Sequence, residues 1–170
     1  LTQNQEEIIN EINVDLRSDK KMFRILQGDV GSGKTIVSFM TSANVLETGY
    51  QSALMAPTAI LAKQHYNLSK KIFDGTKIKI KLLTGKTEPK LRKKILEDLK
   101  SGEIDFLIGT HALFQKKIEF KKLGFIIIDE QHKFGVKQRM SFAEKGGKNC
   151  DVLLMSATPI PRTMMLTIYG

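Results

Sequence analysis

The stretch Gly28-Asp29-Val30-Gly31-Ser32-Gly33-Lys34-Thr35 follows an apolar run at residues 23–26 and precedes a helical pattern at residues 34–48. Its spacing, G-x-x-x-x-G-K-T, is typical of a loop that wraps backbone N–H groups around a phosphate. The glycines remove Cβ clashes, Lys34 neutralises phosphate oxygens, and the Thr35 hydroxyl takes a place on Mg²⁺. The helix that follows directs its positive dipole end at the phosphates. A glycine-rich turn without a ligand is the alternative, but the flanking strand and helix favour a nucleotide-binding α/β fold.

Outward from this loop, short apolar runs alternate with longer amphipathic segments. We predict strands at residues 23–26, 52–56, 77–82, 104–108, 125–128 and 152–155, and helices at 2–16, 34–48, 60–73 and 90–100. Residues 77–82 alternate strictly between apolar residues and lysines, which predicts a strand with one wet face near a sheet edge. The whole pattern predicts an α/β fold with a mostly parallel sheet and helices on both faces, in one domain over residues 1–170.

The chain has 170 residues, of which 41% are hydrophobic and 26% charged, with one cysteine. This balance excludes a disordered chain and a membrane-embedded protein, and the single cysteine excludes a disulfide scaffold and fits a cytoplasmic protein. The net charge is +9, but 22 of the 27 basic residues are lysine. That charge fits a nucleic-acid binder and a lysine-rich composition equally well. The absence of an initiator methionine leads us to expect an excised fragment.

A second acidic motif follows the apolar run at residues 125–128. There the chain continues Asp129-Glu130-Gln131-His132. Beside a phosphate loop, Asp129 can hold magnesium and Glu130 can polarise an attacking water. An Asp-Glu pair alone is usually a solvated strand end, but together with the loop it indicates a nucleotide hydrolase.

The other strand ends carry small polar residues: Ala56-Pro57-Thr58, Leu83-Thr84-Gly85, Gly109-Thr110-His111 and Ser156-Ala157-Thr158. Each of them alone is better explained as a turn or a helix cap. In a parallel sheet, however, all of them reach the edge beyond the carboxyl ends of the strands, where ligands bind. Their exposed N–H groups suit a sugar–phosphate chain, so we predict a second, phosphate-rich ligand there.

Taken in order, GDVGSGKT, APT, LTG, GTHALFQ, DEQH and SATPIPRT resemble the first motor domain of superfamily 2 helicases over essentially the whole chain. More narrowly, GDVGSGKT, IIIDEQHKFGVKQR and SATPIPRT resemble the RecG branch-migration helicases. The resemblance implies a RecA-like fold, ATP and Mg²⁺ as cofactors, and an ATP-dependent helicase or translocase on branched or forked double-stranded DNA in recombination and repair. It also implies a bacterial, nucleoid-associated monomer without a membrane partner. A transcription-repair coupling translocase and an RNA helicase remain the alternatives within this superfamily.

The resemblance also implies a role for each matching residue. ATP binding falls to Gln5, Gly28, Asp29, Gly31, Ser32, Gly33, Lys34 and Thr35. Catalysis falls to Lys34, Asp129 and Glu130, with magnesium at Thr35 and Asp129. DNA contacts fall to Pro57, Thr58, Gly85, Thr110 and His111. Coupling between ATP and DNA falls to Gln131, His132, Ser156, Ala157, Thr158 and Arg162. For Gln5, an ordinary helix-start glutamine is an equal alternative to an adenine reader.

Two departures from the family pattern are visible. The chain has Ala59 where relatives often carry an acidic residue. A second motor lobe with its arginine fingers, and a DNA-junction wedge domain, are expected in the full-length chain but are absent from this sequence. Because arginine fingers contribute about 10³ to 10⁵ in rate in related enzymes, we expect these residues alone to be nearly inactive.

Smaller signals fit structural roles. His65 is interpreted as a packing or surface residue, Cys150 as a small hydrophobe, and residues 90–100 as a solvated basic face. Outside the superfamily, a kinase or other ATPase and a passive DNA-binding module are the remaining functional alternatives.

Overall fold

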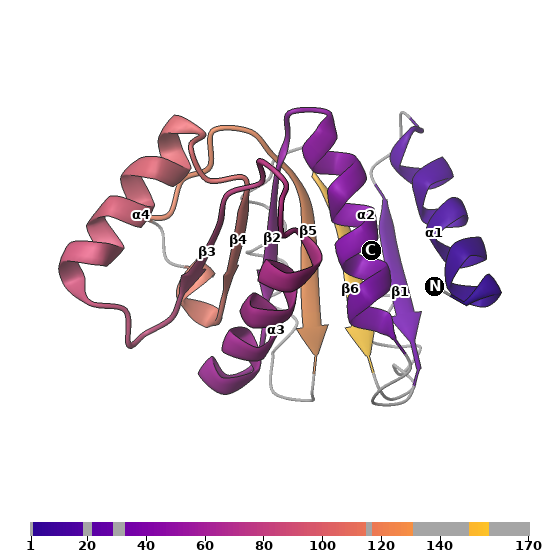
Figure 1. Ribbon diagram of the computed structural model, residues 1–170, viewed down its shortest axis with the longest axis horizontal. Helices are drawn as coiled ribbons and strands as arrows, with labels where there is room; N and C mark the ends of the chain where they lie inside the picture. The colour runs from indigo at the N-terminus through magenta and orange to yellow at the C-terminus, as the bar shows by residue number, and fades with distance from the viewer. Residues whose placement is uncertain (1, 19–21, 29–32, 115–116, 131–149, 157–170) are drawn as a thin grey trace.

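The computed structural model describes residues 2–18, 22–28, 33–114, 117–130 and 150–156. Within these residues one six-stranded sheet forms, with the order β1-β6-β5-β2-β4-β3 (Figure 1). The strands are β1 Phe23–Gln27, β2 Gln51–Met55, β3 Ile80–Leu83, β4 Phe106–Gly109, β5 Leu123–Glu130 and β6 Asp151–Ser156. Every pairing between them is parallel, which confirms the predicted α/β class.

Helices cover both faces of the sheet, as predicted. They are α1 Gln3–Leu16, α2 Lys34–Glu47, α3 Ala59–Ile72, α4 Pro89–Ser101 and the 3₁₀ helix η1 His111–Phe114. Helices α1, α2 and α3 share one apolar cluster with the sheet, whereas α4 packs into a second cluster on the opposite face (Figure 1). In the described part of the chain, no helix combines the length and the apolar character needed to cross a bilayer.

The two clusters explain the unbroken apolar run in β5. Phe125 and Ile127 belong to the cluster under α2 and α3, and Ile126 and Ile128 to the cluster under α4. A strand buried on both faces needs apolar residues at every position, because successive side chains point to opposite sides. The same alternation places the next residue, Asp129, on the side of α2 and α3.

The strand predicted at residues 77–82 is shorter in the structure and begins later. Ile80 pairs with Phe106, the first residue of β4, so the three residues before Ile80 have no strand opposite them. Lys79 is instead held by Asp105, whose carboxylate accepts from the Lys79 N–H at 2.8 Å and whose own N–H donates to the Lys79 carbonyl at 2.9 Å. The predicted edge position is confirmed, and Lys81 is exposed on the wet side.

Candidate active site and nucleic-acid interface

The register of three strands brings the phosphate loop and the acidic motif together. Strand β6 lies between β1 and β5, and Ser156 pairs with Gln27 on one side and with the backbone of Glu130 on the other. The Gly28 N–H then donates to the Ser156 carbonyl at 3.2 Å. The start of the loop and the end of the acidic strand therefore meet at one edge, as parallel strands require.

The start of α2 is arranged to receive an anion. Gly33 precedes the helix in the left-handed region, with φ of 85°, and no side chain caps the first-turn N–H groups. The Lys34 ammonium donates to the Gly28 carbonyl, across the mouth of the loop. Uncapped N–H groups, the positive end of the helix dipole and a lysine together favour a bound phosphate.

Gln5 lies against this loop. A Cβ on Gly33 would fall 2.0 Å from the Gln5 side-chain nitrogen, which would have to move away, and the φ of 85° already favours glycine there. The side-chain Oε1 of Gln5 accepts from the Thr2 backbone N–H at 2.9 Å, and the Thr2 hydroxyl accepts from the Gln5 backbone N–H at 3.2 Å. Gln5 thus belongs to the capping box of α1 and also touches the predicted nucleotide site, so both of its sequence interpretations fit its position.

The carboxylate of Asp129 is nearly buried, with 13% of the side chain exposed, and its Oδ2 lies 2.7 Å from His65 Nε2. Sequence reasoning missed this contact, because His65 was interpreted only as a packing or surface residue. The packing part is correct: the ring is buried and lies edge-on to Phe39, with centroids 6.5 Å apart. Helical periodicity alone could have placed His65 on the inner face of α3, but not opposite Asp129.

The ends of β2 and β4 hold four of the predicted DNA contacts: Pro57, Thr58, Thr110 and His111. Met55 pairs with Gly109, so both strands end at the same level. The Thr58 hydroxyl caps α3 by accepting from the Leu61 N–H at 3.2 Å. Thr110 is buried and precedes η1, whereas His111 is exposed. The local alternative, a cap or turn, therefore describes Thr58 correctly.

The end of β3 completes this side of the edge. Gly109 approaches β3 so closely that a Cβ there would lie 2.2 Å from the Leu83 carbonyl oxygen. A turn follows, in which the Thr87 hydroxyl accepts from the Thr84 N–H at 3.0 Å. Gly85 is exposed in this turn. Three polar strand ends thus lie side by side, beyond β5 and beside the phosphate-loop half of the edge.

Several predicted site residues lie outside the described residues: Asp29, Gly31, Ser32, Gln131, His132, Ala157, Thr158 and Arg162. For Glu130 the structure describes the backbone only. Their predicted roles therefore stay predictions.

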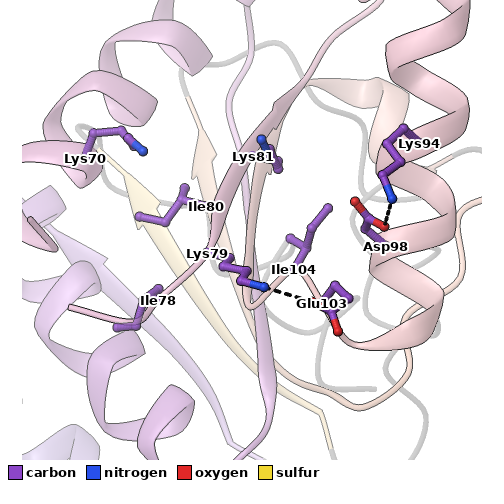
Figure 2. Close-up of a pocket in the computed structure, with 9 residues that line it drawn as sticks. All are labelled: Lys70, Ile78, Lys79, Ile80, Lys81, Lys94, Asp98, Glu103 and Ile104. Atoms are coloured by element: carbon purple, nitrogen blue, oxygen red, sulfur yellow. Dashed lines mark hydrogen bonds and ion pairs between the residues drawn. The ribbon is translucent and has the colours of Figure 1, made fainter. Parts of the chain in front are cut away.

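A hollow of about 420 Å³ lies elsewhere, between α3, β3 and α4 (Figure 2). Two of its lysines are neutralised by neighbours: Lys79 lies 2.8 Å from Glu103, and Lys94 lies 2.9 Å from Asp98. The hydrogen bond from Lys79 lowers the pKa of the Glu103 carboxyl below its ordinary value. This part of the positive charge belongs to exposed ion pairs on a solvated face, as predicted for residues 90–100, and is not a built anion site.

The described residues fit ATP and magnesium. A Cβ on Gly33 would crowd the Gln5 side chain beside the loop, and no side chain caps the first turn of α2. Thr35 and Asp129 would supply hard oxygen ligands to the metal. Mg²⁺ usually keeps waters and substrate phosphates around one or two such protein ligands, so this small donor set suits it.

Comparisons with known proteins agree with this geometry. The chain is 53% identical over 100% of its length to ATP-dependent DNA helicase RecG of Aquifex aeolicus, and 51% identical to that of Streptococcus pneumoniae. A solved structure of RecG bound to a three-way DNA junction shares 48% identity, with a TM-score of 0.84 over 100% of this chain and 22% of that one. The predicted RecA-like fold and the predicted resemblance to RecG helicases are confirmed.

A more distant structure, DEAD-box helicase Mss116 bound to ssRNA and UDP-BeF, has a TM-score of 0.76 over 99% of this chain and 38% of that one. At 22% identity this likeness shows the fold alone. The chain spans about a quarter of the length of the curated relatives it matches. The sequence model of DEAD/DEAH box helicases matches residues 2–166. The chain belongs to the DEAD/DEAH box helicase family.

Proposed function

We propose that the chain is the first motor lobe of an ATP-dependent DNA helicase that acts on branched or forked double-stranded DNA. The observation that carries this proposal is the strand register at the sheet edge. It sets the phosphate loop level with the end of the acidic strand β5, beside three polar strand ends. The RecG relatives, at about 50% identity, support DNA rather than RNA as the substrate.

In this proposal the chain's own residues position the nucleotide. Lys34 releases the Gly28 carbonyl and neutralises the β- and γ-phosphates, while the first-turn N–H groups of α2 bind the phosphate oxygens. Thr35 and Asp129 would hold magnesium, which would neutralise the charge that develops on the phosphates. Glu130 orients the attacking water and accepts its proton. Gln5 reads the base from its place beside Gly33.

The other half of the edge holds the DNA backbone. Pro57, Thr58, Gly85, Thr110 and His111 contact phosphate and sugar, which gives position without sequence preference. Strand β6 lies in the nucleotide half of the edge, where Ser156 pairs with the strands that carry the phosphate loop and the acidic motif. We assign the coupling role to Ser156 together with the motif residues that follow β5 and β6.

The full activity requires more than these residues. We propose a second motor lobe that closes over the nucleotide and a wedge domain that engages the junction, both in the same longer, monomeric bacterial protein. Opening and closing of the cleft between the lobes would step the backbone contacts along DNA. We expect the 170-residue chain alone to hydrolyse ATP far more slowly than that protein.

The test is ATP hydrolysis by the full-length protein with forked DNA, linear duplex, single strands and RNA of matched length. We expect the strongest stimulation by forked DNA and loss of stimulation in Lys34→Ala. Preference for RNA would replace the DNA assignment. A Lys34→Ala variant that keeps full function with DNA would indicate a passive binding module instead.

A further inference from the structure

A histidine and a carboxylate from distant parts of the chain meet under the candidate active site. His65 Nε2 lies 2.7 Å from Asp129 Oδ2, and only 11% and 13% of the two side chains are exposed. His65 comes from the middle of α3, whereas Asp129 comes from the carboxyl end of β5. An ionised carboxylate only accepts hydrogen bonds, so Nε2 carries the hydrogen in this contact.

The histidine ring is itself fixed in place. It lies edge-on to Phe39, at an interplanar angle of 86°, and Phe39 is fully buried on α2, the helix that begins at the phosphate loop. His65 therefore touches both elements that frame the nucleotide: α2 through the ring edge of Phe39 and β5 through Asp129. A surface histidine would be free to turn, but this one is held by packing on one side and by a charge-assisted bond on the other.

We propose that His65 is a positioning residue for the magnesium-binding carboxylate. Its N–H holds one oxygen of Asp129 and so fixes the rotation of the carboxylate, which leaves the other oxygen for the cation or its bound water. Groups that orient metal-binding carboxylates in this way change metal affinity or activity by about 10- to 100-fold when they are removed. This inference rests on the proposed function, because it needs magnesium at Asp129.

Three variants of the full-length protein separate positioning from packing. His65→Phe keeps an aromatic ring against Phe39 but removes the donor. His65→Gln places an amide N–H at about the reach of Nε2 and restores it. Ser69→Ala is the matched control: Ser69 is fully buried on the same helix, and its hydroxyl donates to the Tyr66 carbonyl instead of contacting Asp129.

The affinity for a fluorescent ATP analogue is measured over a range of Mg²⁺ concentrations. The value compared between variants is the Mg²⁺ concentration at which half of the gain in affinity is reached. The kcat for ATP hydrolysis is measured at saturating Mg²⁺. We expect His65→Phe to raise this concentration by at least about 10-fold, the lower end for such groups. We expect His65→Gln to return within about threefold of wild type, and Ser69→Ala to leave it unchanged even where its melting temperature falls. A wild-type Mg²⁺ requirement in His65→Phe would overturn the proposal.

If His65→Phe does not fold, His65→Asn replaces it, because the shorter amide cannot reach Oδ2. Equal Mg²⁺ requirements in the Asn and Gln variants would then also overturn the proposal. A wild-type protein that binds the analogue without any dependence on Mg²⁺ would instead reject the proposed function itself. That failure is distinguishable, because it is seen before any substitution is made.

Discussion

Helices α2 and α3 lie on the same face of the sheet, each follows a parallel strand, and each has 14 residues, yet they begin differently. Helix α3 is closed by its own cap, since the Thr58 hydroxyl accepts from the Leu61 N–H. Helix α2 starts from left-handed Gly33 with no side-chain cap. One helix start has a side-chain cap and the other has none. This contrast fits the proposal that α2 binds the phosphates and that the end of β2 before α3 contacts DNA.

The largest expected effect comes from removing the cation at the open helix start. Lys34→Ala should lower kcat/KM for DNA-stimulated ATP hydrolysis by about 10² to 10³, the range for losing one donor aimed at developing negative charge. Steady-state kinetics of the full-length protein provide the measurement. Hydrolysis within a few-fold of wild type would show that α2 is not the phosphate end.

A side chain at position 33 should reduce nucleotide binding nearly as strongly as the loss of Lys34 reduces hydrolysis. Gly33→Ala puts a Cβ where φ is 85° and where the Gln5 amide lies 2.0 Å away. A non-glycine residue in the left-handed region costs roughly 1 kcal/mol of unfolding free energy. We expect the loss of nucleotide-binding free energy to be larger than that. Equilibrium binding and thermal unfolding, measured together, separate the two effects. Gly49→Ala is the control, because it also has positive φ but nothing lies within 4 Å of its Cβ.

Gln5 tests whether the helix cap and base recognition can be separated. Gln5→Glu keeps an acceptor for the Thr2 N–H, so α1 should unfold at nearly the wild-type temperature. The lost amide donor should cost about 1 to 1.5 kcal/mol, or close to tenfold in affinity, for ATP relative to GTP. Unchanged discrimination between the two nucleotides would leave Gln5 as a helix cap only.

The smallest effect should come from the closed helix start. Thr58→Ala removes the α3 cap and should cost about 1 kcal/mol of unfolding free energy without changing ATP affinity. Denaturant unfolding checks the first value and nucleotide titration the second. A loss of ATP affinity as large as that of Gly33→Ala would remove the contrast between the two helices.

Much of this arrangement was predictable from local pattern. The phosphate loop, the acidic strand end and the alternation at residues 77–82 each depend on neighbours in sequence, so the parallel sheet and its functional edge followed from them. The sequence prediction placed the start of β3 too early, because that start depends on where β4 begins. Before Ile80, the Lys79 N–H donates to the Asp105 carboxylate instead of to a neighbouring strand. The His65–Asp129 contact could not be predicted, because it depends on how α3 lies across β5.

The central claim is that one edge of the sheet holds two ligands in separate halves. Hydrogen exchange of the full-length protein, with a non-hydrolysable Mg-ATP analogue or with a DNA junction alone, tests it most directly. The analogue should protect amides at residues 33–37, and the junction should protect amides at residues 58–61, 84–87 and 110–113. Protection of the α2 start by DNA alone, or of none of the three DNA segments, would contradict the account.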